Sequence, residues 1–282
     1  MSAAVVDVVE VEPREPVERG IASTPCDRTV DPPSGGARVV PQTSKAWCAY
    51  FRTNERRLLG VPWERGAELM PEEKAAIAES VQGFQLGESS EGKHLIHCAI
   101  IHAARIGDPD YVTAIRHLIR EEQRHARDLG RFMTLAGVPL ISHTWPDTVF
   151  RMLRRQAGLE ISVGVLVTAE IIAKVYYVAL REATRSAVLR RICDQIIRDE
   201  YEHVKFQTER LAILRRGYPP SRIRLISALH RFLFFGACLV VWWKHGRALR
   251  TGGCGFKRFW RDAWGEMSGD LLRMDPREWI CL

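Results

Sequence analysis

The stretch "IREEQRHARDLG", residues 119–130, places Glu122 and His125 three residues apart in a segment with the period of an amphipathic helix. Adjacent turns of a helix bring such a pair side by side. Residues 197–206, "IRDEYEHVKF", repeat the pattern with Glu200 and His203. One E-x-x-H pair is common on a solvated helix face, so the repeat is what indicates two halves of a single site.

Two further glutamates extend the pattern. Glu170, in "VLVTAEIIAKVYY", precedes Glu200, and Glu91, in "GESSEGKHLIHC", precedes Glu122 by a similar interval. The two lone glutamates are 79 residues apart, and the two histidines of the E-x-x-H pairs are 78 residues apart. This spacing predicts a duplicated helical hairpin, in which antiparallel helices bring each lone glutamate level with an E-x-x-H pair.

The rest of the chain is helical in period, and no stretch has the pattern and turn chemistry of a strand. The expected class is therefore all-α. We predict a helix that ends near Arg105, then helices over about 109–135, 161–183, 186–216 and 221–249. Residues 1–44, rich in Pro, Gly and Ser, are expected to be a disordered tail. Residues 45–216 form the predicted helical domain, and residues 217–282 an apolar helix and a basic, aromatic tail that pack on it.

Each of the four glutamates lies within the apolar stripe of its helix. On the 109–135 helix, for example, Leu118, Glu122, His125 and Leu129 recur at three- and four-residue steps. A carboxylate that faces a core costs several kcal/mol unless it is paired. Two divalent cations would balance four such carboxylates. The donor set of four carboxylates and two imidazoles favours two Fe ions, with Mn as the alternative, over a structural zinc.

On these residues the chain resembles the ferritin-like di-iron carboxylate superfamily, which places one Glu on each of two helices and E-x-x-H on each of the other two. The resemblance covers about residues 75–215. Rubrerythrin-like proteins are the most similar in layout, but the seven cysteines include no C-x-x-C for a rubredoxin domain. It implies a four-helix bundle of two repeated hairpins, followed here by a fifth, apolar C-terminal helix. The implied metal ligands are Glu91, Glu122, His125, Glu170, Glu200 and His203.

The resemblance further implies a di-iron oxidoreductase that activates O2 or peroxide, with an unknown small-molecule substrate and an unidentified electron donor. Tyr177, on the stripe of Glu170, is a candidate catalytic phenol or hydrogen-bond donor, although a plain core tyrosine is the more common case. Two other functions stay open: an iron-binding protein of the ferroxidase type without organic turnover, and a metal-free helical interaction module. An apolar chamber beside the metals would favour oxidation of an organic substrate.

Several residues near the motifs compete for roles. Glu88 is the rival of Glu91, and His94 is either an extra ligand or a flanking side chain. Glu121 and Glu202 neighbour the ligand acids and are expected to face solvent or to form salt bridges.

The segment "FLFFGACLVVWW", residues 232–243, allows three interpretations: a helix that covers the bundle, which we favour, an interfacial membrane helix, and a membrane span. Peripheral membrane contact through residues 225–250 and a homodimer are therefore both compatible with the sequence. The net charge of +7 does not by itself indicate nucleic acid, and none is expected as a partner. The N-terminus lacks the basic start of a secretory signal, so we expect a cytoplasmic protein, with membrane association as the alternative.

Overall fold

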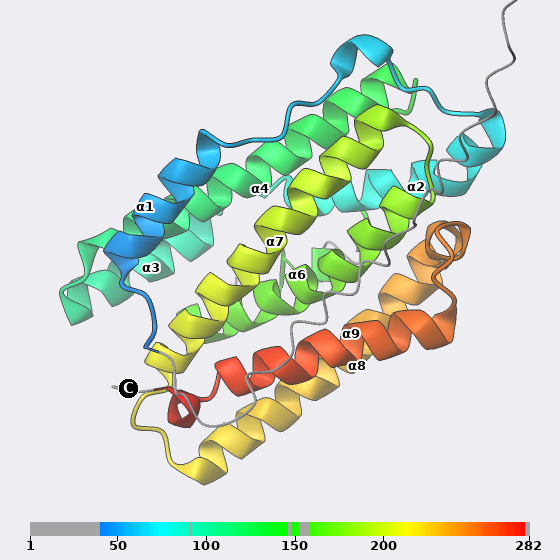
Figure 1. Cartoon of the computed structure of the whole chain (residues 1–282). Helices are drawn as coiled ribbons and strands as arrows, with labels where there is room; N and C mark the ends of the chain where they lie inside the picture. The colour runs from blue at the N-terminus through cyan, green and yellow to red at the C-terminus, as the bar shows by residue number, and fades with distance from the viewer. Residues whose placement is uncertain (1–39, 91, 146–147, 150, 153–157, 280–282) are drawn as a thin grey trace, which may run out of the picture. The chain divides into compact units, whose positions relative to one another are not determined.

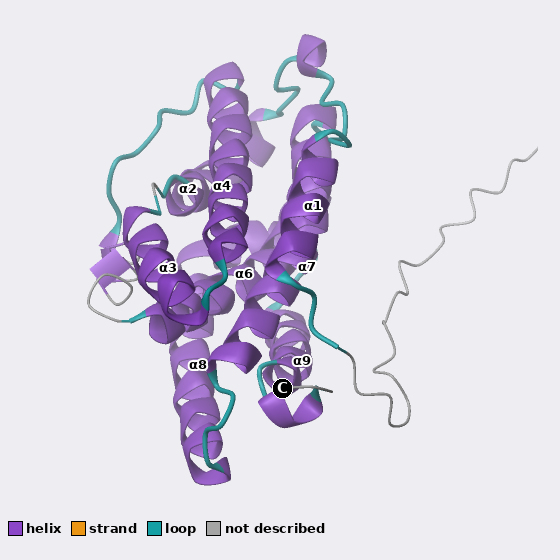
Figure 2. Cartoon of the chain, turned by 90° about the vertical axis from the view of Figure 1, so that its left-hand side faces the viewer, coloured by secondary structure: helices purple, strands orange, loops and turns teal. Residues whose placement is uncertain are grey.

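The computed structural model describes residues 40–90, 92–145, 148–149, 151–152 and 158–279. This part of the chain is helical and contains no β-strand (Figure 2), which confirms the all-α class. The predicted tail lies outside the described residues as far as position 39, and the first helix begins at Ser44. The helices are α1 (Ser44–Glu55), η1 (Trp63–Arg65), α2 (Pro71–Glu88), α3 (Lys93–Ile106), α4 (Pro109–Leu135), α6 (Leu159–Glu182), α7 (Ala187–Leu214), α8 (Pro220–Thr251), α9 (Phe256–Arg273) and η2 (Pro276–Glu278).

Local sequence signals set most of the helix ends. Pro71, Pro109 and Pro220 each occupy the first turn of a helix, where the missing N–H has no intrahelical partner to lose. The hydroxyl of Ser186 accepts a hydrogen bond from the N–H of Leu189 at 3.2 Å and so caps α7. The predicted bounds of α4, α6, α7 and α8 agree with the structure to within two residues.

The helix predicted to end near Arg105 is in fact broken. Helix α2 ends at Glu88 and α3 starts at Lys93. Gly92 adopts a left-handed conformation with φ 62°, and a Cβ there would lie 2.4 Å from the Cδ1 of Ile119 on α4. A glycine is needed where the backbone takes this conformation and approaches a neighbour so closely. The break leaves Glu88 at the very end of α2.

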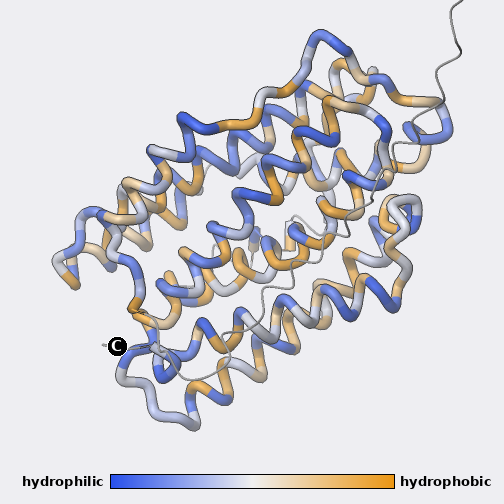
Figure 3. The backbone as a smooth tube through the Cα atoms, viewed as in Figure 1, coloured by the Kyte–Doolittle hydropathy of each residue, from blue (hydrophilic) through white to orange (hydrophobic). Residues whose placement is uncertain are grey.

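The helices pack around α4, α6 and α7. Helix α4 contacts α1, α2, α3 and α7, while α6 contacts α7, α8 and α9 (Figure 1). Hydrophobic and hydrophilic residues alternate along the helices (Figure 3), as expected where one face of each is buried. Large side chains fill the core: Trp47 and Phe51 of α1 contact Phe206 of α7, and Tyr176 of α6 stacks on Phe84 of α2. The described cysteines are free thiols, as a reducing compartment would allow.

The C-terminal segment continues as helical structure packed on this core. Residues 256–273, expected as a tail, form α9, which contacts α6, α7 and α8. The buried ammonium of Lys174 on α6 lies 2.6 Å from a carboxylate oxygen of Glu266 and 3.5 Å from one of Asp270, both on α9. Because a buried cation needs such partners, this ion cluster holds α9 against α6.

Candidate metal centre

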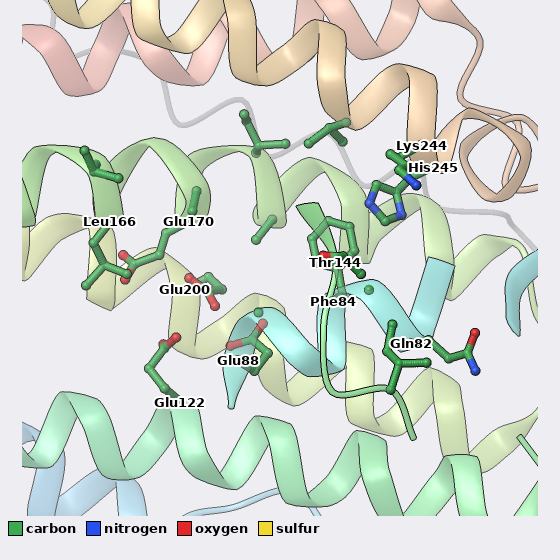
Figure 4. Close-up of a pocket in the computed structure, with 18 of the residues that line it drawn as sticks. Gln82, Phe84, Glu88, Glu122, Thr144, Leu166, Glu170, Glu200, Lys244 and His245 are labelled. Carbon is green, nitrogen blue, oxygen red and sulfur yellow. The ribbon is translucent and has the colours of Figure 1, made fainter. Parts of the chain in front are cut away.

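Four helices direct carboxylates and imidazoles toward one buried point. The ligand atoms form two groups, and within each group they lie within 4.8 Å of one another. One group is Glu88, Glu122, His125 and Glu200, and the other is Glu122, Glu170, Glu200 and His203. Glu122 and Glu200 belong to both groups. Figure 4 shows the four carboxyl groups, from α2, α4, α6 and α7, turned toward one another. Each group could hold one metal ion, with Glu122 and Glu200 available to both positions.

Both histidines turn the same ring nitrogen toward this point. The Nε2 of His125 lies 3.0 Å from a carboxylate oxygen of Asp199, and the Nε2 of His203 lies 2.8 Å from one of Glu121. Since a carboxylate can only accept, each Nε2 carries the hydrogen and donates it. Each Nδ1 therefore faces the cluster, and that of His125 lies 3.6 Å from a carboxylate oxygen of Glu88. A carboxylate on the far nitrogen is the usual support of a metal-binding histidine.

Unsatisfied buried atoms mark the centre of the cluster. The Nδ1 atoms of His125 and His203, Oε1 of Glu122 and Oε2 of Glu200 are buried and make no hydrogen bond among the described residues, and the Nδ1 of His203 lies 2.9 Å from Oε1 of Glu122. Buried polar atoms without partners are rare because each costs free energy. These four atoms come from four ligand side chains and face one point, so the residues fit a pair of metal ions.

The cluster shifts the pKa values of its own members. Burial and the nearby charge of Glu122 raise the pKa of Glu170 to about 8. Burial disfavours the charged form of His125, but its hydrogen bond with Asp199 and the nearby carboxylate of Glu88 raise its pKa to about 9. Without cations, protons therefore offset part of the negative charge at neutral pH. Cations bound at the same point would displace these protons.

The structure brings together five of the six residues predicted as ligands: Glu122, His125, Glu170, Glu200 and His203. The sixth, Glu91, lies outside the described residues. The position expected for it is taken by Glu88, the rival within the same short sequence. His94 belongs to neither group, and its Nε2 lies 3.5 Å from the Sγ of Cys98. The break after α2 explains the difference, because it aims the last residue of that helix at the cluster.

The acids that support the histidines were missed from sequence. Glu121, expected at the surface or in a salt bridge, is only 4% exposed; it lies 3.8 Å from Arg124 and also accepts from His203. Asp199, fully buried, has the mirror-image role for His125. One amide nitrogen of Asn54 on α1 donates to both acids at 2.8 Å. The sequence did contain a signal for these acids, because in both motifs an acid directly precedes the Glu of E-x-x-H: Glu121 before Glu122, and Asp199 before Glu200. Glu202 pairs with nearby Lys205 at 3.8 Å, as expected for a surface acid.

Tyr177 lies beside the cluster. Its hydroxyl donates a hydrogen bond to Oε1 of Glu88 at 2.7 Å, and its side chain is fully buried. Burial and the carboxylate raise the pKa of Tyr177 well above its usual value, so the phenol stays protonated and remains a donor. The contact orients the Glu88 carboxylate.

A cavity of about 410 Å³ opens onto the carboxylates. Glu88, Glu122, Glu170 and Glu200 lie at one end, while Lys244 and His245 of α8 lie toward the other (Figure 4). The walls between them are mainly apolar and come from α2, α6, α8 and the 141–144 segment: Phe84, Ile141, Val165, Leu166, Ala169, Ile172, Ala173 and Val241. An organic molecule that entered this cavity would reach the carboxylate cluster through apolar surroundings.

Comparisons with family models, curated proteins and solved structures found no match to the chain.

Proposed function

We propose that the protein is a dinuclear-metal oxidoreductase of the ferritin-like type, with two iron ions, that uses O2 or peroxide to oxidise an organic substrate. The observation that carries the proposal is the pair of ligand groups that share Glu122 and Glu200. Helices α2, α4, α6 and α7 would then be the four-helix bundle, with α2–α4 and α6–α7 as its repeated hairpins.

The donor set supports iron or manganese. Each metal position would have one imidazole and three carboxylates, two of them shared, and neither ligand group contains a thiolate. Hard oxygen donors with one imidazole each suit these metals. Two divalent ions would neutralise the four glutamates that otherwise repel one another in a buried site. When bound in the ferrous state, the ions would supply the electrons that reduce O2 or peroxide.

The protein's own residues would orient and protect the reaction. Asp199 and Glu121 hold the two imidazoles with Nδ1 inward, and Tyr177 holds Glu88. The apolar walls of the cavity would exclude water and position the substrate beside Glu170. This apolar chamber favours organic oxidation over iron storage or detoxification, for which a polar route to the metals would be expected. Electrons for repeated turnover require a donor that is not part of the chain.

The test is metal content per chain in protein purified from iron-supplemented cells, with manganese measured in the same samples. Wild type should contain about two metals. Removing a shared ligand, as in Glu122→Ala or Glu200→Ala, should abolish both. Removing an unshared one, as in Glu170→Ala, should weaken one position and leave the other occupied.

Glu202→Ala is the matched control, because this acid lies on the same helix as Glu200 but points away from the cluster and pairs with Lys205. It should retain the wild-type content. Wild type without metal, or unchanged content in Glu122→Ala and Glu200→Ala, would overturn the dinuclear site. Metal-loaded protein that consumes O2 only until its iron is oxidised, with no acceleration by any lipophilic substrate, would favour iron handling.

A further inference from the structure

Helix α8 exposes an apolar face along most of its length. The exposed residues recur at three- and four-residue steps and therefore lie on one side of the helix. They are Leu225, Leu229, Phe232, Phe235, Leu239 and Trp243, here called the α8 stripe, with exposed fractions from 42% to 78%. At 1.5 Å per residue the stripe is about 27 Å long. A contiguous apolar face of this size on a soluble protein usually marks an interaction site.

The charges of α8 are all of one sign. It contains no aspartate or glutamate, and no charged residue lies between Phe232 and Trp243. The cations lie before and after this central part: Arg222, Arg224 and Arg231 on one side, and Lys244, Arg247 and Arg250 on the other. An apolar face with cationic ends and tryptophan at one edge is complementary to a lipid surface that carries negative charge.

The opposite face of α8 is attached to the protein. The Nε2 of His230 lies 2.8 Å from the hydroxyl of Thr168 on α6, and the Nδ1 of His245 lies 2.8 Å from the hydroxyl of Ser80 on α2. These contacts, fifteen residues apart on the helix, hold α8 along the side of the core. The helix therefore covers the core, as favoured from sequence, and presents its other face outward.

Two helices, α6 and α8, are long and apolar enough to cross a membrane by length and composition, but 78% of the apolar window of α6 is buried, against 22% for α8. For α8, a transverse orientation conflicts with α9. Phe235 packs on Trp260 of α9 with ring centroids 5.4 Å apart, and the next residue, Arg261, has a 75% exposed side chain. If α8 crossed a bilayer, this arginine would lie near the hydrocarbon centre, at high cost. The stripe fits an orientation in the plane of the interface.

A second copy of the chain fits the stripe less well than a lipid does. In a two-fold dimer through α8, the cationic ends of the helix would face the cations of the partner's α8, since α8 has no acidic residue. Lipid phosphates would instead compensate these charges. The rings of Trp243 and Trp145 lie 6.3 Å apart at the end of the stripe, and both are partly exposed. Tryptophan is enriched at membrane interfaces, where its ring is apolar and its N–H is hydrated.

We propose that the α8 stripe docks on an anionic lipid surface and that the cavity takes a lipophilic ligand from it. The cavity is lined by Val241, Lys244 and His245 of the same helix, and by Thr144 next to Trp145. One end of the cavity therefore lies beside Trp243, at the end of the stripe. Docking is independent of the proposed function. That the lipophilic ligand is a substrate rests on the proposed function. Lipid docking and ligand binding are therefore both tested on metal-free protein.

Docking is measured by sedimentation of the full chain with vesicles of phosphatidylcholine alone or with 30% phosphatidylglycerol. Binding should require the anionic lipid and weaken with salt. Phe232→Glu, which places a charge in the centre of the stripe, and the double variant Arg224→Glu/Arg231→Glu should each lower the partition coefficient at least about tenfold.

The matched control is Ile101→Glu, because this residue is 59% exposed on α3, away from the stripe. It should bind vesicles like wild type. Circular dichroism melting checks that Phe232→Glu folds, which is expected for a side chain 78% exposed. No vesicle binding by wild type, or equal binding by Phe232→Glu and wild type, overturns the proposal. Light scattering that shows a dimer dispersed by Phe232→Glu, without vesicle binding, assigns the stripe to a second copy instead.

The ligand is tested with 11-(dansylamino)undecanoic acid as the fluorescent probe. Wild type should bind it, and Ala173→Trp, which fills the cavity, should lower affinity at least tenfold. Phe232→Glu should still bind the probe in solution, since the stripe lies outside the cavity. Equal binding by Ala173→Trp and wild type overturns the lipophilic ligand. Because no metal is present, a failure of metal binding leaves both results readable.

Discussion

Replacing Glu121 with glutamine removes a charge next to His203 without changing the size of the side chain. The carboxylate is buried, with one oxygen accepting from Nε2 of His203 at 2.8 Å and the other from the amide of Asn54 at 2.8 Å. Glutamine has one acceptor oxygen and an NH2 group. Its NH2 would have to face one of these two donors, so one hydrogen bond is lost and His203 is held less firmly.

The expected size follows from this loss. Removing the partner of a metal-binding histidine lowers metal affinity by about 10- to 100-fold. Because Glu121→Gln loses both the charge and one of two hydrogen bonds, we expect a loss of metal affinity of about 100-fold, which is about 2.7 kcal/mol of binding free energy. Only the position that uses His203 should be affected. Asp199→Asn, at an acid that also accepts from Arg124 and Gln195, should weaken the position that uses His125.

The assay is anaerobic calorimetric titration of metal-free protein with Fe(II), which resolves two classes of binding position. Wild type should fill both, Glu121→Gln should weaken one class, and Asp199→Asn should weaken the other. Glu202→Gln, a partly exposed acid of α7 that touches neither histidine, is the control and should titrate like wild type. Equal weakening of both classes by each variant would refute the pairing of acids with histidines, and unchanged affinities would refute their role.

Three further outcomes are expected. In the folded metal-free protein the pKa of Glu170 is about 8 and that of His125 about 9, against ordinary values of 4.5 and 6.5 in the unfolded chain. The folded state therefore binds these protons more tightly, and the melting temperature should fall as the pH rises from 5 to 9. Bound metal should remove that decline, and a melting temperature that rises with pH would contradict it. Tyr177→Phe should lower Fe(II) affinity about tenfold at the position that uses His125, in the same titration, while a change confined to the other position would count against the contact. Gly92→Ala, at φ +62° with no room for a Cβ, should lower the free energy of unfolding by about 1–3 kcal/mol, as measured by urea denaturation. Gly265→Ala, where a Cβ meets open space, should raise it by about 0.5–1 kcal/mol. Equal effects of the two substitutions would show that Gly92 is not constrained.

Helix periodicity and doubled E-x-x-H spacing were sufficient for much of this arrangement. The stripe positions of Glu122, His125, Glu170, Glu200 and His203 follow from the 3.6-residue repeat, and the structure places all five at one buried point. Their role as metal ligands stays a prediction that metal analysis will test.

Other parts of the site depend on contacts between segments far apart in the chain. Asn54 bridges Glu121 and Asp199 from a helix outside the repeated pattern. Nothing in the residues around Asn54 identifies that role, because a long-range hydrogen bond leaves no local period. The choice between Glu88 and Glu91 was also beyond the sequence, since both acids flank the same "SS" pair.

The sequence by itself determined the all-α class, most helix bounds and the faces on which five of the clustered side chains lie, because helix geometry and capping are local properties. Only the tertiary structure decided that α2 ends at Glu88, since the close approach of Gly92 to Ile119 on α4 is a contact between helices. It also decided that α8 covers the core with one face and exposes the other. Burial depends on what packs against a helix, and the periodicity of the helix alone cannot specify its neighbour.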